Sequence, residues 1–119
     1  MGEVSKIAPL SGSTDGIPVL VDQTNIATGT VIHTCGALTV DGHGDKIELW
    51  AFNSDTSTRV LKLGLGGVTE PNHVINISMA AGSWEHILPC WFGRNSLVAR
   101  ASCDVANKVI IVGYRLRVS

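Results

Sequence analysis

Residues 46–53 read Lys-Ile-Glu-Leu-Trp-Ala-Phe-Asn, which is the clearest alternating pattern in the chain. Successive side chains of a β-strand point to opposite faces, so the odd-numbered and even-numbered residues of this stretch would lie on different faces. The odd-numbered set is Ile47, Leu49 and Ala51, and the even-numbered set is Glu48, Trp50 and Phe52. The stretch therefore predicts a strand.

The chain around this strand reads as further short extended runs separated by turn residues. We predict eight strands, at residues 17–21, 28–34, 46–53, 58–63, 73–79, 84–88, 96–101 and 108–118. Glycine-rich and Asn/Asp-rich segments such as 41–44 and 64–67 separate them, as expected of turns. No window shows helical spacing over ten residues, so the sheets must be largely antiparallel.

These runs predict an all-β fold, an antiparallel two-sheet sandwich of the jelly-roll-like or Greek-key type with about eight strands. The run 109–112 is apolar on both faces, which suits a central strand or a strand covered by a second subunit. A sandwich domain is expected over residues 17–119, preceded by an N-terminal arm over residues 1–16. The arm shows no periodicity, and it either frays or docks on a neighbour through its isolated apolar residues, Val4, Ile7 and Leu10.

Composition and charge narrow the class of partner. The 119 residues suit one domain, and charged residues make up 16% of them against a usual value of about 25%. We therefore expect part of the surface to face another protein. The formal net charge of −1 gives no overall field for nucleic acid or anionic lipid, so neither nucleic acid nor membrane is expected as a partner.

The start of the chain lacks the apolar run of a signal peptide, and production in the cytoplasm is expected. From Cys90 onward basic residues outnumber acidic ones, and Asp104 is the acidic residue of this part. The basic residues are Arg94, Arg100, Lys108, Arg115 and Arg117. They either meet an acidic partner or are outward strand positions that keep the surface soluble.

No motif for catalysis or cofactor binding is found. Residues 64–67 have the glycines of a phosphate loop but lack the Lys-Ser/Thr that would follow. The four histidines, at positions 33, 43, 73 and 86, lack the local spacing of a metal site, although folding could bring them to Cys35 or Asp45. We predict no catalytic, cofactor-binding or metal-binding residues, no cofactor, and no enzymatic activity. The three cysteines, Cys35, Cys90 and Cys103, are expected to be reduced and buried.

Aromatic residues cluster at Trp84, Trp91 and Phe92, within nine residues. Three roles are open to them, which are packing in the core, anchoring a subunit contact and stacking on a sugar ring. We take them as candidate subunit-interface residues.

The ordered set of segments resembles a family of small β-sandwich capsid decoration (cement) proteins of tailed bacteriophages. The matching segments are TGTVIHT (28–34), ELWAFN (48–53), LGGVTEP (65–71), ILP (87–89), NSLVARA (95–101) and ANKVIIVGY (106–114). The chain departs from the pattern at Cys35 and Cys90, where small residues are expected, and in the arm.

The resemblance implies a structural virion protein, assembled in the host cytoplasm, that binds the outer surface of the head and stabilises contacts between capsid subunits. Its partners would be the major capsid protein and its own copies in a closed homo-oligomer, a trimer being favoured over a dimer. Val4, Ile7 and Leu10 would then anchor the arm on the capsid or a neighbouring subunit.

Two alternatives stay open. The first is a tail, baseplate or fibre adaptor or host-binding module of the virion, which copy number per particle would separate from a capsid protein. The second is a carbohydrate-binding module, which would require an exposed flat row of indoles from Trp50, Trp84 or Trp91.

Overall fold

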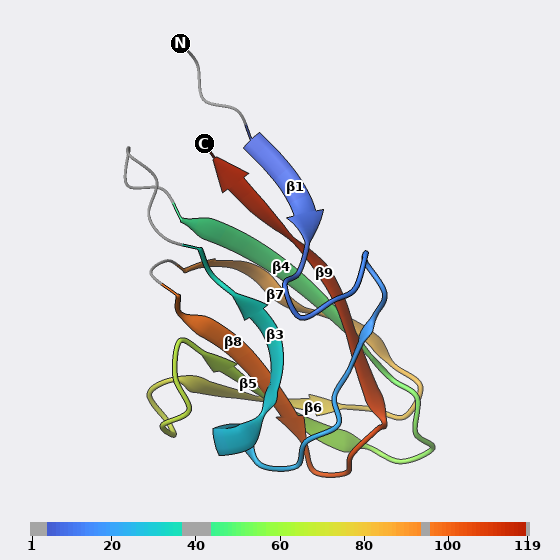
Figure 1. The fold of residues 1–119 in the computed structure, drawn as a ribbon. Coiled ribbons are helices and arrows are strands. Elements are labelled where there is room, and N and C mark those ends of the chain that lie inside the picture. Colours follow the sequence, from blue (N-terminus) through green and yellow to red (C-terminus); the bar gives the residue numbers. More distant parts are fainter. Residues whose placement is uncertain (1–4, 37–43, 94–95, 119) are drawn as a thin grey trace.

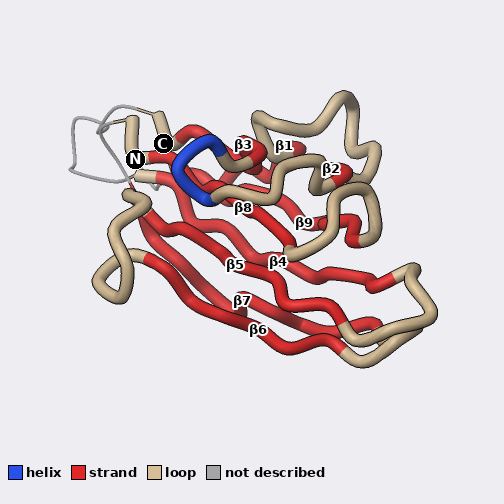
Figure 2. Tube along the Cα trace, turned by 90° about the horizontal axis from the view of Figure 1, so that it is seen from below, coloured by secondary structure: helices blue, strands red, loops and turns tan. Residues whose placement is uncertain are grey.

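The computed structural model of the chain describes residues 5–36, 44–93 and 96–118 (Figure 1). Within these ranges it contains nine strands and one short 3-10 helix. The strands are β1 (Ser5–Pro9), β2 (Val19–Leu20), β3 (Thr30–Thr34), β4 (Asp45–Asn53), β5 (Arg59–Leu65), β6 (Val74–Met79), β7 (Trp84–Gly93), β8 (Val98–Cys103) and β9 (Val109–Val118). The 3-10 helix η1 (Ile26–Thr28), blue in Figure 2, is capped by the Asn25 side chain. Nowhere in the described ranges is there a helix of the length and apolarity that a membrane crossing needs.

The strands form two antiparallel sheets. One has the order β1-β9-β4-β7, with β2 also pairing with β9, and the other has the order β3-β8-β5-β6. The chain pairs β1 with β9, β3 with β8, β4 with β7 and β5 with β6, and successive pairs alternate between the two sheets. A long hairpin wound in this way is a jelly roll, so the predicted two-sheet β-sandwich is confirmed.

The predicted N-terminal arm needs correction, because part of it belongs to the sandwich. Strand β1 pairs with β9 so that Ser5 lies opposite Val118, which places the first and last strands side by side (Figure 1). Leu10 then enters the core with 1% of its surface exposed. The next turn is held to the other sheet by a 2.9 Å hydrogen bond from the Gly12 amide to the Ile32 carbonyl. Residues 5–12 therefore link the two sheets.

Several predicted boundaries also shift. The strand expected at 17–21 is reduced to β2, whose two residues pair with β9. The strand expected at 84–88 continues to Gly93, because β7 stays paired with β4 through two irregularities in register.

Strand β4 carries the alternation that the sequence predicted. Its odd-numbered residues are all buried, with Ile47, Leu49 and Ala51 in the core, Asp45 at one end of the strand and Asn53 at the other. The Asn53 amide nitrogen donates to the carbonyls of Ser57, Met79 and Ala80, so this end of the sandwich is closed by hydrogen bonds. Strand β9 is central in its sheet, as one reading of its two apolar faces predicted.

Candidate functional site

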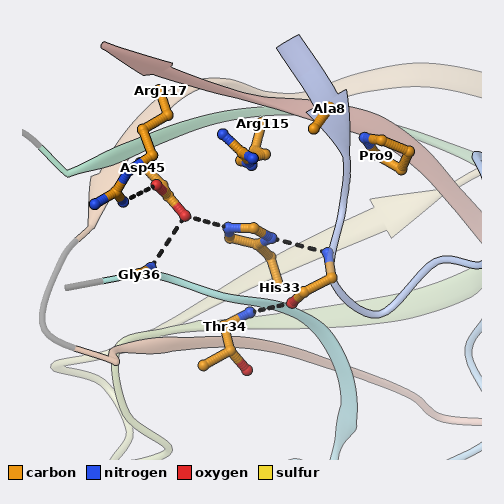
Figure 3. A pocket seen from close by; sticks show the side chains of 9 residues that line it. Ala8, Pro9, His33, Thr34, Gly36, Asp45, Arg115 and Arg117 are labelled. Carbon is orange, nitrogen blue, oxygen red and sulfur yellow. Dashed lines mark hydrogen bonds and ion pairs between the residues drawn. The ribbon is translucent and has the colours of Figure 1, made fainter. Parts of the chain in front are cut away.

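A charged cluster centred on Asp45 occupies the opposite end of the core (Figure 3). Asp45 begins β4 and is 3% exposed. One carboxylate oxygen accepts from His33 Nε2 at 2.8 Å and from the Gly36 amide at 3.1 Å. The other accepts from an Arg117 guanidinium nitrogen at 2.6 Å. Because Arg117 is opposite Asp45 in the β4–β9 register, the sheet itself sets this ion pair.

Burial alone would raise the pKa of Asp45, because the charged form is poorly solvated there. Hydrogen bonds from His33, Arg117 and the Gly36 amide outweigh this effect and hold the pKa of the carboxyl below its ordinary value. Asp45 is therefore a buried carboxylate that stays charged at neutral pH, and three donors compensate it.

The hydrogen bonds of His33 fix its tautomer. The Ser11 amide donates to Nδ1 at 3.0 Å, so the ring proton lies on Nε2 and is donated to Asp45. The Ser11 hydroxyl oxygen accepts from the Thr34 amide at 2.6 Å. A serine, a histidine and an aspartate thus lie together, but the lone pair that a general base needs is occupied by a backbone amide. The arrangement links β3 to the segment after β1.

His33, Cys35 and Asp45 also have the ligand types that zinc accepts, and their ligand atoms lie within 4.8 Å of one another. Histidine binds a metal as the neutral ring, so a metal at Nε2 would move the ring proton to Nδ1, against the Ser11 amide. Burial, followed by the charge of Asp45, raises the pKa of the Cys35 thiol to about 11. The group is therefore arranged as a hydrogen-bonded network with a protonated thiol beside it.

The outer face of the five-stranded sheet carries two groups of apolar side chains, with polar residues among them. Residues directly opposite each other in antiparallel strands point to the same side, so the pairing defines rows across the sheet. One row is Leu20, Ile110, Phe52 and Trp84, and another is Ile7, Leu116, Lys46 and Phe92. Val112 and Trp50 lie opposite each other between the two rows. We call the nine apolar and aromatic residues of these rows the apolar face: Ile7, Leu20, Trp50, Phe52, Trp84, Phe92, Ile110, Val112 and Leu116.

A small polar group lies in the middle of the apolar face. Glu48 pairs with His86 Nε2 at 2.8 Å and accepts a hydrogen bond from the Tyr114 hydroxyl. That hydrogen bond raises the pKa of the Tyr114 phenol. The Trp50 ring stacks on His86 with ring centroids 4.7 Å apart. One side of the indole is therefore already covered.

The predicted site residues divide between the core and this face. Ile7, Trp84 and Phe92 are exposed by 73%, 55% and 50%, and all three belong to the apolar face. Leu10 was predicted to anchor the arm on another molecule. It packs instead in the chain's own core and offers no such anchor. Trp91 lies opposite the buried Ile47 and packs against the core. Val4 lies outside the described residues.

The tryptophans and cysteines differ in exposure. Trp84 is the exposed member of the three tryptophans, so the indoles form no exposed row of the kind a sugar platform requires. Cys35 and Cys103 are buried as expected, whereas Cys90 is exposed, because it lies on the outward side of β7. Comparisons of the chain with protein-family models, curated proteins and solved structures give no significant match.

Proposed function

We propose that this chain is a structural virion protein of a tailed bacteriophage, a capsid decoration protein that binds the outer surface of the head as a homo-oligomer. The apolar face is the observation that carries this proposal. Large apolar side chains gathered and exposed on one face mark contact surfaces, and Ile7, Leu20, Trp84 and Phe92 are each exposed by 45–73% here. Trp84 and Phe92, near the two ends of β7, are the residue types that anchor protein interfaces.

The rest of the molecule supports a role in binding rather than in catalysis. Both ring nitrogens of His33 are engaged, by the Ser11 amide and by Asp45, so the imidazole beside Ser11 has no free lone pair to act as a base. The two-sheet sandwich is closed at both ends by hydrogen-bonded polar side chains, Asn53 and Asp45. Jelly rolls also serve as viral capsid domains, although the fold alone does not assign a function.

In this proposal the apolar face is buried between copies of the chain, with a trimer favoured, and the assembled oligomer rests on the major capsid protein. Several weak contacts made together gain affinity through effective concentration, so each contact with the capsid can be modest. Ile7, on the β1 edge of the same face, replaces Leu10 as the N-terminal contact residue.

Light scattering on the purified chain tests the oligomer. Trp84→Glu places a charge in the apolar face, and Val60→Glu is the matched control, since Val60 is an exposed apolar residue of β5 in the other sheet. We expect wild type and V60E to be trimers and W84E to dissociate with at least about 30-fold weaker association, the size of a hot-spot loss.

The second measurement is binding to purified phage heads, with the number of bound copies counted. Hundreds of copies per particle agree with a capsid protein, whereas a handful indicates the tail. A chain that stays monomeric at all accessible concentrations and binds no heads would refute the proposal.

A further inference from the structure

A pocket of about 420 Å³ opens beside the Asp45 cluster (Figure 3). It lies between β1 and β3, which are edge strands of the two sheets. Its polar lining includes Ser11, Thr34, Arg115 and Arg117, and Ala8 and Pro9 also line it.

The two arginines reach this pocket because of the alternation of β9. They are two residues apart, so both point to the inner side of the sheet, where Arg115 lies opposite the buried Ile47. Further along the same inner face, β9 contributes the core residues Val109 and Ile111. The two arginines therefore lie on the inner face of β9 where the apolar core ends.

The charges of the described residues that line the pocket do not balance. Asp45 accepts from Arg117, His33 and the Gly36 amide, so its negative charge is already engaged by three donors. His33 is held as the neutral ring by the Ser11 amide. Arg115 adds a second positive charge, which leaves the described lining with a net charge of +1 from two arginines and one aspartate.

Arg115 also has an unmet hydrogen-bonding need. One terminal guanidinium nitrogen is buried and has no acceptor among the described residues. In Figure 3 its side chain lies beside the hollow with no dashed line to a neighbour. Buried polar groups in proteins are almost always paired, and the residue that carries this unpaired nitrogen lines the pocket, so its guanidinium is a candidate donor to another molecule.

We propose that this pocket is a binding site for a carboxylate group, held by Arg115 with help from Arg117 and the Ser11 hydroxyl. Arginine presents a planar fork of donors that matches the two oxygens of a carboxylate. One negative charge neutralises the described lining, whereas a phosphate dianion would leave an excess negative charge next to Asp45. The site therefore selects a singly charged oxyanion. The carboxylate comes from a free small acid or from an acidic side chain of a neighbouring protein.

The test is an NMR titration of the full-length, isotope-labelled chain with sodium acetate at constant ionic strength. We expect saturable shifts of the Arg115 side-chain N–H signal and of the Ser11 and Thr34 amides. Sodium chloride and inorganic phosphate serve as comparison ions. The capped tripeptide acetyl-Gly-Glu-Gly-amide tests whether a polypeptide can present the group, and its binding would identify the protein source.

Three variants make the result specific. Arg115→Gln removes the fork and should weaken acetate binding at least about tenfold. Arg115→Lys keeps the charge and should recover part of the affinity. Lys46→Gln is the control, because it removes one positive charge from the outer face of the same sheet and should change nothing.

Acetate shifts that fail to saturate, or that persist unchanged in folded R115Q, would overturn the proposal. Tighter binding of phosphate than of acetate would overturn the charge argument and with it the assignment to carboxylates. The titration needs no oligomer and no capsid, so its failure would leave the proposed function untouched.

Discussion

Replacing Asp45 by Asn tests whether the charged cluster stabilises the fold. The asparagine has nearly the same volume but only one acceptor oxygen. In its better orientation that oxygen still accepts hydrogen bonds from His33 and the Gly36 amide. The new NH2 group then faces the Arg117 guanidinium. The substitution therefore loses one charged hydrogen bond outright and makes two others weaker.

The expected cost follows from these contacts. A hydrogen bond to a charged group contributes about 1.5–3 kcal/mol and a neutral one about 0.5–1.5 kcal/mol. Arg117 is partly exposed and can turn toward water, so its loss is discounted to about 1 kcal/mol. With a similar loss at His33 and Gly36 together, Asp45→Asn should lower the free energy of unfolding by about 2 kcal/mol. That is a large part of the roughly 5–15 kcal/mol typical of a domain.

Urea denaturation followed by circular dichroism measures this cost, with Glu70→Gln as control. Glu70 pairs with Lys62 at 2.5 Å on the surface, and removing that pair should cost less than about 1 kcal/mol. A difference between D45N and E70Q below about 0.5 kcal/mol would refute the assignment of the cluster as a stabilising element.

The same variant has a predicted pH dependence. The pKa of Asp45 is lower in the folded chain than in the unfolded chain, so its contribution is complete above the ordinary carboxyl pKa. It is lost as the pH falls through the folded-state pKa. The gap between wild type and D45N should therefore be largest at about pH 7 and shrink at about pH 3. A gap that widens in acid would contradict the direction of the shift.

The remaining predictions concern single side chains. Because Tyr114 is the single tyrosine of the chain, ultraviolet titration reports it alone, and Glu48→Gln should lower its raised pKa toward the ordinary value of 10. An unchanged titration in the variant would show that Glu48 is not the cause. In the folded, dissociated W84E chain a thiol reagent should modify Cys90 rapidly and spare Cys35 and Cys103, whose burial raises the pKa of both thiols. All three should react in urea, and fast native labelling of Cys35 would contradict its placement.

The sequence predicted those elements whose own side chains carry the pattern. Strand β4 was found because its buried and outward residues alternate without interruption. Strand β1 was missed because Ser-Lys-Ile-Ala-Pro has no such alternation, and its place depends on pairing with β9, more than 100 residues away. A strand that is specified by its partner leaves little trace in its own sequence.

The candidate site shows the same division. Trp84 and Phe92 were selected from their clustering in sequence, but the apolar face also needs Leu20 and Ile110, which only the sheet order brings beside them. Arg115 and Arg117 were noted as part of a basic C-terminal third. The ion pair between Arg117 and Asp45 joins residues that are 72 positions apart, which no local spacing could reveal.

Strand β9 places the two proposed surfaces on opposite sides of one strand. Its even-numbered residues from Ile110 to Leu116 point to the apolar face, and its odd-numbered residues end in Arg115 and Arg117 at the pocket. A shift of one residue in register would exchange the two sets, burying the apolar residues and turning the arginines outward. The β4–β9 pairing prevents this, since only the observed register places Arg117 opposite Asp45 and Tyr114 opposite Glu48. Association through the apolar face and carboxylate binding in the pocket therefore depend on different residues of the same strand, and substitutions on one side should leave the other side's function intact.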